Sequence, residues 1–365
     1  MADSSISILE GNTFVVSDRR GDVDASPTDT HGLFHNDTRF LSRWIFTVDG
    51  QRPNVLSVDS LNYFATQFFL VPGTGTVYVD SPLSIMRQRA VGHGFHENLT
   101  ILNHTAEAKD VDVRLEADCD FADLFEVKDA LAKKGECYRR VEDHRLVLGY
   151  RRERFVRETW ISSDAAAAVD DRGLGFRVHL APHGTWNAGI DVVTAVTGLG
   201  RASTRAKYAG GDDTPRPNMG ASLEEWLAQA PKLVTSWPSL AQTYRRSLVD
   251  LAALRFFPVI APGQALPAAG LPWFMTIFGR DSLLTSLQAL PFSPRARAHD
   301  ADGPRLAPGI HPRRLPRRGA GPHPARVPRR RAHRVRGAAA LSVLWHRRRD
   351  AAVSHPARRI RAVDR

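Results

Sequence analysis

The sequence predicts an N-terminal all-β domain, an antiparallel β-sandwich, followed by a helical region and a disordered basic tail. Three observations lead to this prediction. Short runs of alternating or β-branched residues fill the chain up to Gly198. Apolar residues then recur at helical spacing as far as Phe292. From Pro294 onward a narrow alphabet takes over, mainly Arg, Ala, Pro, His, Gly, Val and Leu.

The β domain is assigned to residues 1–205. Turn formers such as "VDGQRP" and "DDRGLG" separate its strand-like runs. Many short strands with closely spaced turns are typical of a large sandwich. The clearest predicted strands cover residues 14–18, 43–53, 76–92, 96–105, 109–118, 144–152 and 175–184.

A Gly/Pro/Asp-rich stretch, "YAGGDDTPRPNMGAS", marks a linker at residues 206–221. Ser222 and Glu225 then form a capping-box pattern that predicts a helix start at "LEEWLAQA". A second helix is indicated by Leu240, Tyr244, Leu248 and Leu251, and a third by Leu283, Leu284, Leu287 and Leu290. This region, 222–293, is the second predicted domain.

The formal charge of +11 belongs to the tail. Residues 294–365 carry 20 Arg and 4 Asp without Lys or Glu, a net +16, which leaves residues 1–293 at −5. Out-of-frame reading of GC-rich DNA gives this alphabet, and regrouping the degenerate codons restores acidic segments such as "TADAT". We therefore interpret 294–365 as out-of-frame translation, with the frame change near Ser293–Arg295. The alternative is a nucleic-acid-binding arm held by bulk electrostatics, which deletion of the tail would test.

Other bulk features indicate a soluble cytoplasmic protein. Cys119 and Cys137 are the only cysteines, and two in a chain of 365 residues fit a reducing compartment. The N-terminus lacks a secretory pattern, and no uncharged apolar run reaches membrane-spanning length. We expect no cofactor and no membrane partner.

The run "PWFMTIFGRDSLLTSLQ" carries the clearest chemistry. Trp273 could stack on the apolar face of a pyranose, while Arg280 and Asp281 supply donors and acceptors for paired hydroxyls. The alternative is that Asp281 or Ser282 caps a helix while Trp273 and Phe274 pack in a core. Spacing alone leaves both open.

This run resembles the start of the catalytic domain of bacterial glycogen debranching enzymes, the amylo-α-1,6-glucosidase family. It is also similar to the W-x-R-D-S segment of glucoamylase-like (α/α)6 exo-glucosidases. Two further stretches, "GLFHNDTRFLSRWIFTVDG" and "DCDFADLFEVK", resemble the N-terminal β-sandwich of the family. The resemblance covers roughly residues 8–293, with three matches in the family's order.

The resemblance implies a glycoside hydrolase acting on α-1,6 branch points of glycogen-like glucans, with Arg280 and Asp281 binding glucose and Trp273 as a further stacking candidate. Inverting enzymes need two carboxyl groups roughly 6.5–9.5 Å apart, and neither can be assigned here. We therefore assign no catalytic residue. Residues 222–293 supply only the first helices of an (α/α)6 toroid, so we expect a truncated, inactive domain with "FMTIF" and the leucine face exposed.

Two alternatives to the hydrolase stay open: a non-catalytic carbohydrate-binding β-sandwich, and a basic nucleic-acid-binding protein. Four histidines, His31, His35, His93 and His96, lie near turns or strand starts without a ligand pattern. We expect them to form ordinary hydrogen bonds and expect no metal site.

Overall fold

A computed structural model describes residues 5–26, 30–73, 81–129, 131, 133–197, 219–258 and 265–292. The chain divides into two units, Met1–Gly303 and Pro304–Arg365, and all described residues lie in the first. The predicted tail at 294–365 and residues 206–218 of the predicted linker lie outside the described residues.

The larger sheet of the β domain has eight strands, each antiparallel to its neighbours. The long neighbouring strands β9 and β10 alternate buried and less buried residues over most of their length, as a strand with one core face requires. In sheet order the strands are β12 (Glu136–Glu142), β13 (Arg145–Arg152), β14 (Phe155–Ser163), β17 (Thr185–Thr197), β10 (Gly94–Asn103), β9 (Leu83–Gly92), β8 (Ala65–Val71) and β7 (Asn54–Asn62).

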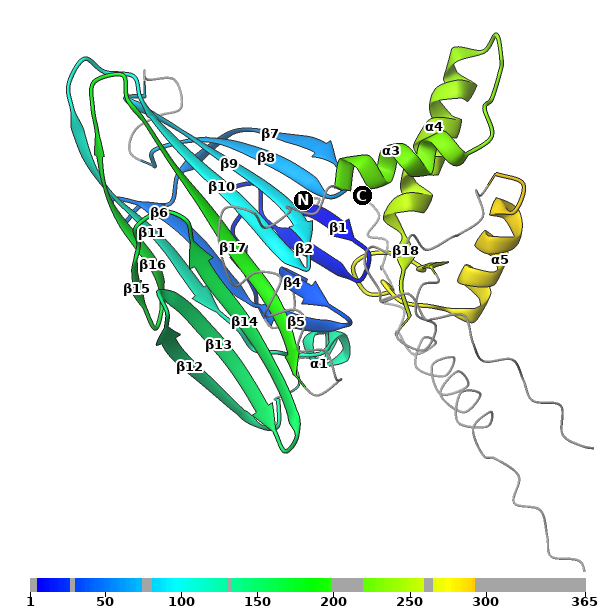
Figure 1. Cartoon of the computed structure of the whole chain (residues 1–365), viewed down its shortest axis with the longest axis horizontal. Coiled ribbons are helices and arrows are strands. Elements are labelled where there is room, and N and C mark those ends of the chain that lie inside the picture. Colours follow the sequence, from blue (N-terminus) through cyan, green and yellow to red (C-terminus); the bar gives the residue numbers. More distant parts are fainter. Residues whose placement is uncertain are drawn as a thin grey trace, which may run out of the picture. The chain divides into compact units, whose positions relative to one another are not determined.

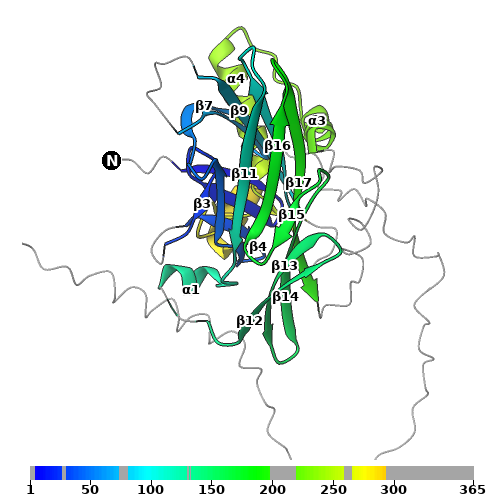
Figure 2. The same cartoon turned by 90° about the vertical axis from the view of Figure 1, so that its left-hand side faces the viewer.

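A five-stranded sheet forms the second layer, and a small four-stranded sheet lies at its side (Figures 1 and 2). The five strands are β15 (Ala168–Asp170), β16 (Gly173–Leu180), β11 (Lys109–Asp118), β6 (Arg43–Val48) and β3 (Val23–Asp24). The four are β1 (Ile6–Glu10), β2 (Thr13–Ser17), β4 (Gly32–His35) and β5 (Thr38–Leu41).

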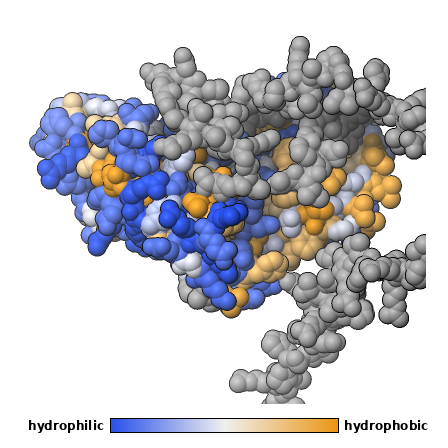
Figure 3. Space-filling view, turned by 60° about the horizontal axis from the view of Figure 1, so that its bottom comes forward, coloured by the Kyte–Doolittle hydropathy of each residue, from blue (hydrophilic) through white to orange (hydrophobic). Residues whose placement is uncertain are grey.

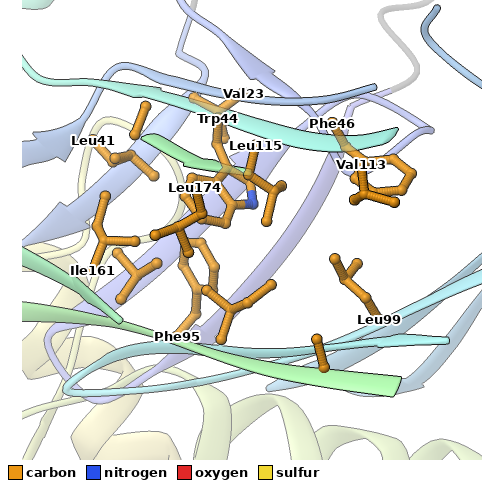
Figure 4. Close-up of a cluster of buried hydrophobic side chains, with 14 of the residues drawn as sticks. Val23, Leu41, Trp44, Phe46, Phe95, Leu99, Val113, Leu115, Ile161 and Leu174 are labelled. Carbon is orange, nitrogen blue, oxygen red and sulfur yellow. The ribbon is translucent and has the colours of Figure 1, made fainter. Parts of the chain in front are cut away.

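The main hydrophobic core fills the space between the eight-stranded and five-stranded sheets (Figure 4). Trp44 of β6 meets Phe95 of β10 edge to face, with ring centroids 5.6 Å apart. Leu115 and Leu174 from one layer and Ile161 from the other are fully buried beside them. Two antiparallel sheets packed on a shared core confirm the predicted sandwich.

A buried ion cluster interrupts this apolar core. Arg87 and Arg89 occupy inward positions of β9, and both bind the carboxylate of Glu97 on β10. Arg87 also reaches Asp22 at 2.6 Å, and Arg89 donates to the Gly21 carbonyl at 2.6 Å. Burial raises the pKa of Glu97, but the two guanidiniums overcome this and hold it below its usual value.

Helices follow the sandwich. They are α3 (Met219–Gln229), α4 (Pro238–Ala253) and α5 (Gly279–Ala289), with the short pair β18 (Arg255–Phe256) and β19 (Leu266–Pro267) between the last two. A short helix, α1 (Leu124–Lys128), lies within the β domain and has a capping box between Asp123 and Glu126. No described helix is long and apolar enough to cross a membrane.

The predicted start of the first helix was wrong. Helix α3 begins at Met219, so Ser222 lies within its first turns and not at its N-cap. Met219 and Ala221 have good helical propensity, which extends the helix upstream into the predicted linker.

The expected exposure of the leucine face is confirmed. On α5, Leu283 is 72% exposed and Leu287 is 64% exposed, and Figure 3 shows apolar side chains gathered over the helical part. The expectation for "FMTIF" holds in part, since Phe274 and Phe278 are exposed while Met275 is buried. Met275 packs in a second core cluster shared with the small sheet.

The ion cluster gives a stability prediction. We expect Glu97→Gln to lower the free energy of unfolding by about 3–5 kcal/mol, because it leaves Arg89 buried without a counter-charge. Urea denaturation followed by tryptophan fluorescence measures the loss. The control is Glu116→Gln, which breaks a half-exposed pair with Arg43 and is expected to cost less than about 1 kcal/mol. Equal losses in the two variants would contradict the prediction.

Candidate functional site

The candidate site lies on the segment from β19 to α5. β19 pairs with β18, which places Leu266 opposite Phe256. A tight turn follows, in which Gly270 and Phe274 exchange two backbone hydrogen bonds of 3.0 and 2.9 Å. The chain then bends at Thr276, is extended at Phe278 and enters α5. This path puts Trp273 in the turn and puts Arg280 and Asp281 in the first turn of the helix.

Helix α5 is anchored through Ser282, its one buried residue. The Ser282 hydroxyl donates to the Pro267 carbonyl of β19 at 2.7 Å, and the Ser282 N–H donates to the Phe278 carbonyl at 2.8 Å. Phe278 occupies the N-cap position without a side-chain hydrogen bond. Neither Asp281 nor Ser282 therefore caps the helix, which removes that alternative for these two residues.

Arg280 and Asp281 are exposed side chains at the start of this anchored helix. Within the described residues, neither takes part in an ion pair or side-chain hydrogen bond. Five guanidinium N–H donors and two carboxylate acceptors are thus available to a ligand. The acidic side chain also lies in the first turn, where the helix dipole favours negative charge.

The apolar residues of this segment differ in exposure. Trp273, Met275 and Ile277 are partly or fully buried, and Trp273 packs against the second core cluster. Phe274 and Phe278 point outward, and their rings meet edge to face at 5.2 Å. Two exposed rings therefore precede Arg280 and Asp281. From the sequence, "FMTIF" was expected to be exposed as a whole, and these two rings were not proposed as ligand contacts, although a period of two in "WFMTIF" could have separated them from the buried residues.

The sandwich holds this segment in two ways. Leu9, Phe14 and Phe34 of the small sheet share the second core cluster with Ala268 and Met275. Phe14 and Phe34 are stacked at 4.7 Å. The second core cluster, which supports the candidate site, therefore contains residues of both the β domain and the helical region.

A polar clamp adds to this apolar contact. In the β1–β2 turn, Gly11 takes a positive φ of 55° and presents Asn12. The Asn12 amide donates to the Phe257 carbonyl and accepts from the Phe257 N–H, both at 2.8 Å. Its amide group also donates to the side chain of Asn36 at 2.8 Å. One side chain thus satisfies both backbone groups of a residue 245 positions away.

A hollow of about 310 Å³ opens beside the clamp and is lined by Glu10, Thr13, His35, His93 and Phe257 among others. His35 lies 2.8 Å from the Thr13 hydroxyl through Nδ1 and 2.9 Å from the Asn36 amide through Nε2. Burial, helped by the charges of His93 and Arg157, lowers the pKa of His35 to about 4.

The histidines form hydrogen bonds where their contacts are described. His35 uses both ring nitrogens. His96 also uses both, binding Asp191 at 2.7 Å and Asn98 at 2.9 Å. The described residues contain no group of three or more His, Cys, Asp or Glu side chains suited to a metal ion.

The β domain is the part of the chain that matches a known protein family. Residues 8–191, half of the chain, match the family model for the N-terminal domain of some glycogen debranching enzymes. No curated protein matches the sequence.

Two solved structures show similarity at 9% sequence identity. A protein described as a kojibiose phosphorylase from the human microbiome aligns with a TM-score of 0.48, covering 69% of this chain and 40% of that one. A galactose mutarotase-like protein from Clostridium acetobutylicum aligns with a TM-score of 0.18, covering 52% and 78%. The chain thus spans less than half of the phosphorylase.

The hydrogen bonds between Asn12 and Phe257 give a prediction about the stability of the neighbouring helix α4. We expect Asn12→Ala to remove two hydrogen bonds to Phe257 and to ease local opening of α4 by about 1–3 kcal/mol. Hydrogen exchange of the α4 amides measures this opening. Asn62→Ala, at an exposed position of β7, is the control and should leave α4 unchanged. Equal protection of α4 in both variants would show that the apolar cluster alone holds the segment.

His35 predicts a pH dependence. The folded protein keeps His35 neutral down to about pH 4, while the unfolded chain protonates it near pH 6.5. The unfolded state therefore binds more protons in this window, and stability falls as the pH drops from 6.5 toward 4. The stability difference between the wild type and His35→Gln should shrink by about 3 kcal/mol from pH 7 to pH 4. Urea midpoints at several pH values measure it, and a constant difference would exclude this role.

Proposed function

The chain belongs to the family defined by the N-terminal domain of glycogen debranching enzymes, and on that premise we propose that it binds α-glucan as part of a glycoside hydrolase. The hydrolase would act at α-1,6 branch points of glycogen-like polymers. Arg280 and Asp281 are the proposed glucose-binding residues. The observation that carries the proposal is that both side chains are exposed on an anchored helix without a partner among the described residues.

The chemistry of these groups suits a sugar. A guanidinium and a carboxylate on consecutive residues offer both donors and acceptors, which match the hydroxyls of a sugar. Phe274 and Phe278, both exposed, add rings that can cover the apolar face of a pyranose. Trp273 remains a stacking candidate, but its half-buried position beside Met275 leaves it less surface for a ligand.

The proposal for this chain concerns binding. Hydrolysis with inversion needs a general acid with a raised pKa and a carboxylate base roughly 6.5–9.5 Å away. No residue is proposed for either role, and we expect no α-1,6-glucosidase activity from these 365 residues alone. A specific nucleic-acid partner is likewise not proposed. We place the chain in the cytoplasm, because Cys119 and Cys137 are both free thiols, as a reducing compartment favours.

The second candidate is a sandwich that binds carbohydrate without turnover. It differs from the first in the location of the site, since binding would then be independent of α5. Substitutions on α5 in the full chain therefore separate the two.

Glucan affinity tests the proposed residues. We expect Arg280→Ala and Asp281→Asn each to weaken binding to glycogen by about tenfold or more, because each removes charge-assisted hydrogen bonds. Affinity electrophoresis in glycogen-containing gels measures the change, with cellulose as a β-linked comparison. Gln288→Ala, an exposed position on the same helix, is the matched control.

Each result of the gel experiment tests a different part of the proposal. If the three variants migrate like the wild type while glycogen still retards the chain, the sandwich carries the site. If glycogen fails to retard the wild type, glucan binding itself is wrong. Retardation by cellulose equal to that by glycogen would reject an α-glucan partner.

A further inference from the structure

The two cysteines lie on segments that the side chain of Arg139 joins. Cys119 directly follows β11, and Cys137 lies on the edge strand β12. Both are free thiols. Cys119 is partly buried and packs against the main core, while Cys137 is exposed.

Arg139 fixes the relation between these two segments. Its guanidinium donates to the Asp118 carboxylate at 2.6 Å and to the Asp171 carbonyl at 3.0 Å. The same Asp118 oxygen accepts from the backbone N–H of Cys119 at 2.7 Å. One carboxylate oxygen therefore joins the β12 side chain to the residue that carries the first thiol.

The strand geometry places the second thiol on the same side. Side chains two residues apart on a strand share a face, so Cys137 lies on the face of Arg139, which is directed at Asp118. Tyr138, between them, points the other way and binds Glu158 at 2.6 Å. Burial and the charge of Asp118 raise the pKa of both thiols, and the charge of Cys137 contributes to the shift at Cys119. This influence of Cys137 on Cys119 agrees with a short separation.

We propose that Cys119 and Cys137 form a redox modification site that closes to an intramolecular disulfide when a glutathione-type disulfide is the oxidant. The exposed Cys137 thiolate attacks one sulfur of oxidised glutathione, forms a mixed disulfide and releases one glutathione thiolate. The Cys119 thiolate then attacks the Cys137 sulfur and releases the second glutathione. Two protein thiols lose their protons and are oxidised, and one glutathione disulfide is reduced to two thiols.

The disulfide would restrict a segment that packs in the second core cluster, which supports the candidate site. Helix α1 lies in the segment between the two cysteines, and its Leu124 and Val127 share the second core cluster with Ala268 and Met275. Linking residues 119 and 137 closes this segment into a loop, which restricts its unfolded conformations. We expect the oxidised form to melt at a higher temperature and to protect the α1 amides from hydrogen exchange.

The test uses the full chain. It is incubated with oxidised glutathione at mildly alkaline pH, quenched with acid, alkylated and digested without reduction. The expected result is a cross-linked peptide pair containing Cys119 and Cys137, a mass loss of about 2 Da and no retained glutathione. The melting temperature should rise and should return to its starting value on reduction.

Variants identify the order of attack. Cys119→Ser should stop at a stable glutathione adduct on Cys137, whereas Cys137→Ser, at an exposed position, should react little. A persistent glutathione adduct on wild-type Cys137, or a dimer linked through Cys137, would overturn the proposal. Two thiols that remain fully alkylatable after the incubation would also overturn it.

Discussion

The arrangement of the candidate site depends on one contact, the packing of the helical segment on the small sheet β1–β2–β4–β5. Phe14 and Phe34 supply the apolar surface on the sheet side, and Ala268 and Met275 cover it. Helix α5 has a single buried residue, Ser282, and that residue binds β19. Without the sheet, the segment would lose the packing contributed by Leu9, Phe14, Val16 and Phe34. Isolated short helices are marginal in water, so this loss would free the segment. The sandwich is therefore the structural base of the site.

Much of the sandwich could be predicted from local patterns. The features that could not be predicted have physical causes. The alternation in residues 83–92 gives β9 with its correct facing, but the inward positions 87 and 89 are arginines. Only the fold brings Glu97 and Asp22 to them. The edge strands β7 and β12, which carry several exposed polar residues, and the short strands β3 and β5 gave no clear signal. Their pairing depends on neighbours distant in sequence.

The candidate site shows the same division. Arg280 and Asp281 could be singled out from their motif, because the chemistry of the two side chains is local. The facing of the aromatic residues was decided by the sandwich, which takes Met275 and part of Trp273 and leaves Phe274 and Phe278 outside. The Asn12 clamp joins residues 245 positions apart and has no local signature. Long-range polar contacts of this kind cannot be read from periodicity.

This geometry also bears on the strength of the proposed interaction. Sites that bind small molecules tightly bury most of the ligand surface, whereas the side chains of Arg280, Asp281, Phe274 and Phe278 are all exposed. A single glucose unit that touches only exposed side chains gains few desolvated contacts, so its binding is expected to be weak. A branched glucan presents many chain ends at once, and repeated rebinding raises the effective concentration of glucose units near these side chains. Under the proposed function, we therefore expect the polymer to bind more strongly than the free sugar.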